Sequence, residues 1–207
     1  MKFDPTFRRV GVAFLSGLLL TASPVALLAE TPADTLVVAD AIDDIVSLDP
    51  AEAYEFSGLD LNNNTYDGLI EIDPATLGMV PGLAESWSVA DDGTTYTFKM
   101  RPGVTFSSGN PLRAEDAAWS LQRVIKLNKT PAFILGQFGW TPENVDQMIT
   151  ADGDTLTLKT DKAYAPTFLY NCLTAGVAEI LDKETVSQHD AGGDMGNAWL
   201  NENSAGT

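Results

Sequence analysis

Two segments with the same internal pattern constrain the fold of this chain more than any other feature. Each has an alternating run, an Asp-Gly turn and a second alternating run: Ser86–Ala90 with Thr95–Met100 around Gly93, and Asn144–Ala151 with Thr155–Thr160. A glycine after aspartate tolerates the positive φ of a tight hairpin turn, and the alternation suits a sheet with one buried face. The sequence therefore predicts two antiparallel hairpins.

Apolar residues at helical spacing lie between and after these hairpins. Ala114–Leu127 is predicted to be a helix, with acidic residues in its first turn and basic residues in its last, as the helix dipole favours. Other helices are predicted over Gly58–Asp67, Ala165–Leu173 and Lys183–His189, and strands over Thr35–Ala39 and Leu69–Asp73. Strands interleaved with helices indicate an α/β (mixed α+β) lobe with locally antiparallel pairing.

The charge balance excludes one class of partner. The 207 residues include 12 Lys and Arg against 29 Asp and Glu, which gives a formal net charge of −17. A protein that binds nucleic acid or an anionic membrane needs clustered basic residues to neutralise phosphates. Here the basic residues are scattered and outnumbered. We therefore expect no nucleic acid partner, and we interpret the acidic surface as a source of solubility.

The first thirty residues have the three-part form of a secretory signal. Basic residues precede the uncharged apolar run Val10–Leu20, and small residues then lead to Ala29. This order predicts a signal peptide over residues 1–29 that is cleaved near Ala29, by the general secretory or the twin-arginine route. A transmembrane anchor is the alternative, because the uncharged stretch is nominally long enough to span a bilayer. Glu30 stands where a lipidated cysteine would be needed, so no lipid anchor is expected.

The reactive side chains give little support for catalysis. Cys172 is the one cysteine and lies in an apolar helical stretch, so we interpret it as a small buried hydrophobe. His189 is the one histidine, and we expect neither a His-based triad nor a multi-His zinc site. The acidic residues between Asp40 and Asp49 lack the spacing of a calcium loop. The sequence predicts no catalytic residue, no metal and no cofactor.

A long ordered stretch carries a family resemblance. It includes Tyr66–Glu71, Val80–Trp87, the first hairpin, Ser108–Leu112 and Ala114–Asp116. This stretch closely resembles the family 5 extracellular solute-binding proteins, which include periplasmic oligopeptide-, dipeptide- and nickel-binding proteins. The similarity runs across residues 35–207. One departure is Arg113, where the family usually has Thr or Ser as a helix N-cap.

The resemblance implies a periplasmic-binding-protein type II-like fold of two lobes, of which residues 30–207 would form only the N-terminal part of lobe I. A truncated chain is therefore expected. The implied function is that of a monomeric periplasmic component of an ABC importer, which captures a small solute and delivers it to permease subunits in the inner membrane. A short peptide is the favoured ligand; opines, sugars and metal chelates stay open. The alternatives are a secreted hydrolase and a sensory or chaperone-like binding protein on the same fold.

The resemblance also points to candidate ligand-binding residues. In similar proteins the loop after the Leu-Asp-Pro turn lines the cleft, and a later segment places an aromatic ring near the peptide backbone. The aromatic residues would cover a ligand, and Glu55 would meet an ammonium group. For each position the alternative is an ordinary surface loop or core packing, and Trp140 is either cleft wall or packing. The candidates are Tyr54, Glu55, Phe56, Ser57, Phe133, Asn171 and Thr174.

Overall fold

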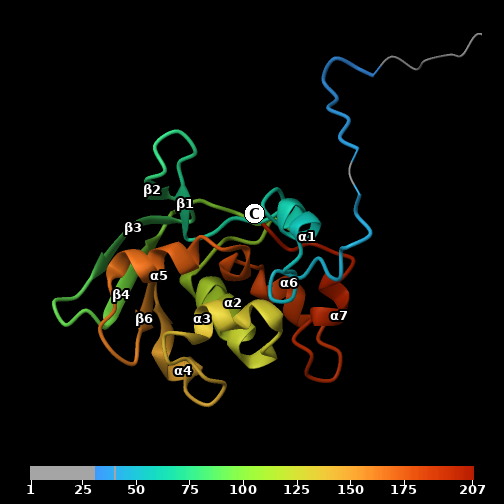
Figure 1. Cartoon of the computed structure of the whole chain (residues 1–207). Coiled ribbons are helices and arrows are strands. Elements are labelled where there is room, and N and C mark those ends of the chain that lie inside the picture. The colour runs from blue at the N-terminus through green and yellow to red at the C-terminus, as the bar shows by residue number, and fades with distance from the viewer. Residues whose placement is uncertain (1–30, 40) are drawn as a thin grey trace, which may run out of the picture. The chain divides into compact units, whose positions relative to one another are not determined.

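The computed structural model describes residues 31–39 and 41–207 (Figure 1). The predicted signal peptide, residues 1–29, lies outside this part of the chain. Of the described residues, 31–39 form one unit and 41–207 form another. Within the described residues, no helix combines the length and the apolar composition that crossing a bilayer requires.

Both predicted hairpins are confirmed, and they join into one antiparallel sheet. β3 (Ala84–Val89) pairs with β4 (Thr95–Met100), and β5 (Ile149–Asp152) pairs with β6 (Thr155–Lys159). β4 also pairs with β6, which gives the strand order β3-β4-β6-β5. The two hairpins therefore supply all four strands of this sheet.

The second hairpin begins later than predicted. Residues Val145–Met148 form the short helix α4, and the strand starts only at Ile149. The side chain of Asn144 accepts a hydrogen bond from the Thr141 backbone N–H at 2.8 Å and donates one to the Gly139 carbonyl at 2.9 Å. Asparagine readily makes such local bonds, which favour turns over strands. The extended start predicted at Asn144 is therefore wrong.

The four-stranded sheet has one buried face, as the alternation predicts. Tyr96 and Phe98 of β4 and Leu156 and Leu158 of β6 are fully buried, whereas Lys99 is exposed. Helix α2, which spans Ala114–Leu127 as predicted, packs against β5 and β6. The core thus lies between the apolar face of the sheet and the helices (Figure 1).

Helix α5 (Pro166–Leu173) lies over the first hairpin. The ring of Tyr170 makes edge-to-face contacts with Trp87, Tyr96 and Phe98, at centroid distances of 6.1, 5.9 and 6.4 Å. Edge-to-face pairs are favourable because the positive ring edge meets the negative face of its neighbour. Trp87 and Phe98 are cross-strand partners and Tyr96 lies two residues from Phe98, so the three rings share one face of the hairpin.

Short elements complete the unit. α1 begins two residues earlier than predicted and ends at Asn62, and β1 pairs antiparallel with β2 as a separate small sheet. The remaining bounds are α1 Phe56–Asn62, β1 Ile70–Ile72, β2 Met79–Pro81, a 3-10 turn Thr130–Ala132, α3 Phe133–Gly136, a 3-10 turn Gly176–Ala178, α6 Lys183–Ser187 and α7 Asn197–Leu200.

The strand predicted over Thr35–Ala39 is wrong. In residues 31–39 the Thr35 backbone N–H donates to the Pro32 carbonyl at 2.9 Å, and Leu36 and Val38 are 86% and 73% exposed. A strand is stable only when its backbone groups pair with a neighbouring strand. The described part of this unit contains no neighbouring strand with which these residues could pair.

Candidate functional site

A buried ion pair fixes the loop that carries the first candidate residues. Asp49, in the Leu-Asp-Pro turn, and Arg123, on α2, are both fully buried. Their contact is bidentate, at 2.8 Å from Nη1 to Oδ1 and 2.5 Å from Nη2 to Oδ2. The Arg123 Nε–H also donates to the Met195 carbonyl at 2.8 Å, and the Ala51 backbone N–H donates to Asp49 at 2.9 Å. The turn is therefore attached directly to the core helix.

Further polar contacts hold the residues just after this turn. Lys129 Nζ lies 3.1 Å from Glu52 Oε1. The amide of Asn197 donates to Asp49 Oδ2 at 2.7 Å and to Glu52 Oε2 at 3.0 Å. Side chains from two distant parts of the sequence, residues 123–129 and Asn197, thus fix the path of the chain immediately before Tyr54.

Glu55 braces the same loop through its own backbone. Its Oε1 accepts a hydrogen bond from the Val46 N–H and its Oε2 accepts one from the Tyr54 N–H, both at 2.9 Å. Burial alone would raise the pKa of the carboxyl, but these backbone donors outweigh it and hold the pKa below its ordinary value. The carboxylate is therefore anionic at neutral pH, and both of its oxygens already have partners.

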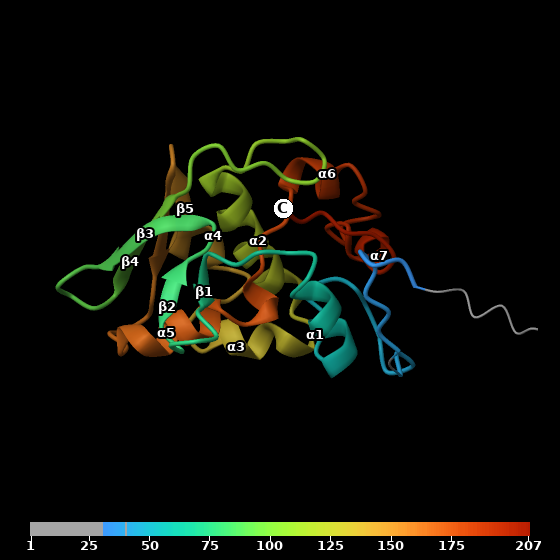
Figure 2. The same ribbon diagram turned by 90° about the horizontal axis from the view of Figure 1, so that it is seen from above.

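Three segments that carry candidate ligand-binding residues meet at one pocket of about 220 Å³, which we call the aromatic pocket. Tyr54 comes from the loop before α1, Ile134 from α3, and Thr174 from the end of α5. Figure 2 shows α1, α3 and α5 along the same edge of the view. Tyr54 meets Phe133 edge-to-face at 5.7 Å, and the two rings are 48% and 56% exposed. Aromatic side chains that remain half-exposed at a pocket offer apolar surface to a ligand.

Of the candidate residues, Tyr54 and Thr174 line this pocket, Phe133 borders it through its contact with Tyr54, and the others lie outside the lining. Phe56 is 92% exposed on α1. The Ser57 hydroxyl donates to the Ala41 carbonyl at 3.2 Å, and the Asn171 amide donates to the Thr167 carbonyl at 2.6 Å. Trp140 is buried, and its Nε1–H donates to the Lys159 carbonyl at 2.6 Å, so it packs in the core.

An acidic pocket of about 140 Å³, lined by Asp67, Glu71 and Glu179 among others, adjoins the aromatic pocket. The two pockets share Asn63, Thr174 and Ala175 in their linings. Among the described residues, no group of three or more His, Cys, Asp or Glu side chains is arranged to hold a metal ion.

Glu179 is the residue of this pocket that sequence reasoning missed. It is 6% exposed, and its Oε2 has no hydrogen-bond partner in the described structure. Burial, and then the charges of Glu71 and Asp67, raise the pKa of its carboxyl to about 8. A sequence signal existed, because Glu179 is the single acid within the otherwise apolar run 177–181.

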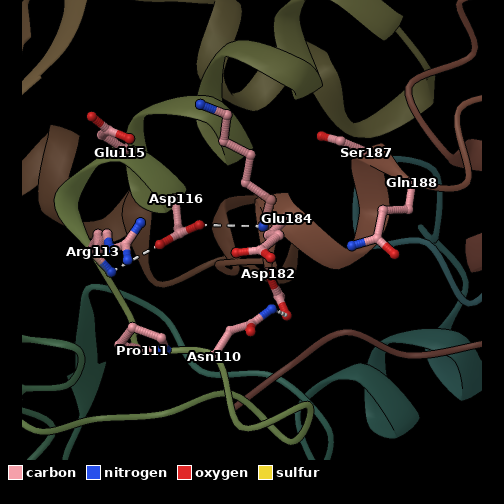
Figure 3. Close-up of a pocket in the computed structure, with 10 residues that line it drawn as sticks. Asn110, Pro111, Arg113, Glu115, Asp116, Asp182, Glu184, Ser187 and Gln188 are labelled. Atoms are coloured by element: carbon pink, nitrogen blue, oxygen red, sulfur yellow. Dashed lines mark hydrogen bonds between the residues drawn. The ribbon is translucent and has the colours of Figure 1, made fainter.

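A separate pocket of about 350 Å³ lies near the starts of α2 and α6 (Figure 3). Two carboxylates in its lining hold neighbouring segments of the chain together. Asp182 caps α6 and accepts hydrogen bonds from the side chains of Ser108 at 2.6 Å and Asn110 at 2.9 Å. Asp116 accepts from the backbone N–H groups of Arg113 at 2.8 Å and Lys183 at 3.3 Å. These carboxylates are occupied by internal donors.

Figure 3 also shows how α2 begins without a Ser or Thr cap. Arg113 stands at the N-cap position, and its guanidinium has no acceptor to offer the helix N–H groups. Asp116, three residues later, instead accepts from the Arg113 backbone N–H. One half of a capping box is therefore retained.

The sequence model of the bacterial extracellular solute-binding proteins, family 5 (middle) matches residues 78–207. Over 211 aligned residues, which include 100% of this chain and 38% of the relative, the chain is 28% identical to the probable D,D-dipeptide-binding periplasmic protein DdpA of Escherichia coli K12. It is 33% identical over 132 residues to the dipeptide-binding protein of the same organism, covering 58% of this chain and 24% of that protein. The chain thus spans well under half the length of these relatives.

The fold is similar to that of solved substrate-binding proteins. A crystal structure described as the substrate-binding domain of an oligopeptide ABC transporter from Bacillus anthracis superposes with a TM-score of 0.62. The two sequences are 27% identical, and the alignment covers 70% of this chain and 30% of that one. The predicted fold class, a mixed α/β arrangement of the periplasmic-binding-protein type II kind, is confirmed.

Proposed function

We propose, from the premise that this chain belongs to the bacterial extracellular solute-binding proteins of family 5, that it forms one wall of the ligand cleft in the periplasmic component of an ABC importer. The ligand is a short peptide, the class named for several of its relatives. Residues 30–207 are part of one lobe, and a second lobe completes the cleft. The protein is a monomeric carrier and leaves its ligand chemically unchanged.

The observation that carries this proposal is the aromatic pocket. Tyr54 and Phe133 present half-exposed rings from two segments that are far apart in the sequence, and Thr174 adds a hydroxyl from a third. An apolar wall with a small number of polar groups is the usual lining of a small-molecule site. Phe56, which is almost fully exposed on the adjacent helix, extends the apolar surface that a closing lobe would cover.

The remaining parts of the transport cycle follow from this role. The signal over residues 1–29 directs export to the periplasm and is removed near Ala29, without lipidation. Ligand contact with both lobes stabilises the closed form, because a ligand favours the state to which it binds more tightly. The permease subunits in the inner membrane then recognise that form.

Native mass spectrometry of the full-length protein, followed by calorimetry with the solute that co-purifies, tests the proposal. We expect a bound short peptide, and we expect Tyr54→Ala to weaken its binding at least about tenfold, or about 1.4 kcal/mol. The control is Leu77→Ala, which removes a side chain that is 79% exposed outside the pocket. Hydrolysis of the peptide, or equal binding by the two variants, would contradict the proposed role.

A further inference from the structure

The acidic pocket is a second feature of this surface that needs a chemical explanation. A carboxyl oxygen that is buried without a hydrogen-bond donor is unfavourable, because it has lost its water and gained no replacement. Glu179 is in this position, with an unpartnered Oε2 and a side chain that lines the pocket. The carboxyls of Asp67 and Glu71 lie near enough to raise its pKa further. What the pocket lacks is a positive charge.

The neighbouring acids have partners of their own. Glu71 Oε1 accepts a hydrogen bond from the Gly68 backbone N–H at 3.0 Å, and Asp67 Oδ2 accepts one from the Thr207 hydroxyl. None of the described residues that line the pocket is a Lys, Arg or His. Glu179 differs from them in that its Oε2 is buried without a donor, so it can accept one from a molecule entering the pocket.

The acidic pocket is also placed next to the aromatic one. Besides the residues that line both, Gly176 connects them: it lines the aromatic pocket, and a Cβ atom added to it would lie 3.8 Å from Glu179 Oε1. The same Cβ would lie 3.0 Å from Leu59 Cδ2, which is closer than most real contacts of this kind. Gly176 therefore lies between Leu59 and the Glu179 carboxylate, where Leu59 leaves little room for a side chain.

We propose that Glu179, flanked by Asp67 and Glu71, receives a primary ammonium group of the ligand whose apolar part lies against Tyr54 and Phe133. This inference rests on the proposed function and names its substrate class, a short peptide or similar solute that carries an amine. An ammonium group has three N–H donors, which suits an unpartnered oxygen among several carboxyls. A cation beside the carboxyl also favours its charged form and offsets the effects that now raise its pKa.

The proposal has a consequence for protons. In the free protein the Glu179 carboxyl, with a pKa of about 8, is largely protonated at neutral pH, with Asp67 and Glu71 as the charged groups that act on it. An ammonium group binds the deprotonated form better, so capture at pH 7 releases a proton. The affinity for the cation should therefore rise as the pH increases through 8.

A small probe tests the pocket independently of any peptide. The full-length protein is labelled with ¹³C at the glutamate carboxyls, and the Glu179 signal is assigned by its loss in Glu179→Gln. Butylammonium chloride is then added, with butanol plus sodium chloride as the matched control. We expect butylammonium to lower the apparent pKa of Glu179 by at least about one unit, a tenfold preference for the charged form, and to leave that of the exposed Glu85 unchanged. An unchanged Glu179 pKa would overturn the proposal.

A pair of peptides then tests specificity. Ala-Lys-Ala and Ala-norleucine-Ala differ in the terminal amine of one side chain, and calorimetry compares their affinities. We expect the lysine peptide to bind at least about tenfold more tightly, with the difference lost in Glu179→Gln and kept in the control Glu85→Gln. Equal binding of the two peptides overturns the ammonium site while leaving peptide capture intact. A failure of both peptides to bind, combined with a positive butylammonium result, instead contradicts the proposed function alone.

Discussion

Two of the buried carboxyls in the described part of the chain, Asp49 and Glu179, differ in how well they are satisfied. Asp49 meets a bidentate guanidinium, a backbone N–H and an amide, whereas Glu179 Oε2 has no partner among the described residues. Removing one member of a buried pair leaves an uncompensated charge, while an unpaired carboxyl lowers that penalty by becoming neutral. The two residues therefore predict opposite responses to the loss of their charge.

Asp49→Asn should destabilise the protein by about 3–5 kcal/mol, because it leaves Arg123 charged and buried. Urea unfolding followed by circular dichroism measures this change in the free energy of unfolding. Glu85→Gln, which removes one member of the exposed pair Glu85–Lys99, is the control and should cost less than about 1 kcal/mol. A similar effect of the two substitutions would show that the buried pair does not hold the turn.

Glu179→Gln should change the dependence of stability on pH. The carboxyl has an ordinary pKa of 4.5 and a folded pKa of about 8. Its contribution to stability is therefore complete below the lower value and is lost as the pH rises through the upper one. Gln does not titrate, so the variant should gain stability relative to the wild type, on the order of a few kcal/mol between about pH 4 and pH 9. Denaturant unfolding at both pH values is the measurement, and parallel curves would refute the assignment.

At the scale of elements, local sequence patterns were sufficient where the local signals agreed. Helix α2 has its predicted bounds, because apolar spacing and terminal charges indicate the same residues. The hairpins follow from alternation and Asp-Gly turns, with φ of 67° at Gly93 and 59° at Gly153. The prediction of a strand over Thr35–Ala39 failed, because a strand needs a neighbouring strand to pair with. Apolar composition does not show whether such a neighbour is present.

The candidate site was partly visible in the sequence. Resemblance placed Tyr54, Phe133 and Thr174 in one region, and the structure brings their segments together. The partnership of Asp49 and Arg123 joins residues 74 positions apart, and no local pattern encodes it. The position of Glu179 beside Asp67 and Glu71 depends on tertiary packing in the same way.

The turn glycines offer a matched pair of element-scale tests. An alanine in place of Gly93 or Gly153 must adopt a left-handed backbone conformation, which costs about 1 kcal/mol. At Gly93 the new Cβ would also lie 3.1 Å from the Ala163 Cβ, whereas at Gly153 nothing lies within 4 Å. We therefore expect Gly93→Ala to lower the melting temperature more than Gly153→Ala. Equal shifts in calorimetric scans would mean that the loop around Ala163 yields freely.

At the scale of the whole molecule, the chain spans 38% of its aligned relative DdpA. The proposed cleft therefore needs the second lobe. We expect residues 31–207 alone to bind Ala-Lys-Ala at least about a hundredfold more weakly than the full-length protein, a difference of about 2.8 kcal/mol. Calorimetry compares the two proteins once circular dichroism has shown that the shorter one is folded. Equal affinities would place the complete site within this chain.

The Asp49–Arg123 contact finally bears on the thermodynamics of capture. Because the turn is attached to α2 through two buried hydrogen bonds, the loop leading to Tyr54 is already ordered when a solute arrives. Immobilising a side chain during association costs about 0.5–1.5 kcal/mol, and here that entropy loss has been incurred during folding. The wall that we propose is therefore preorganised, and we expect the rearrangement that accompanies binding in the opposing half of the proposed cleft.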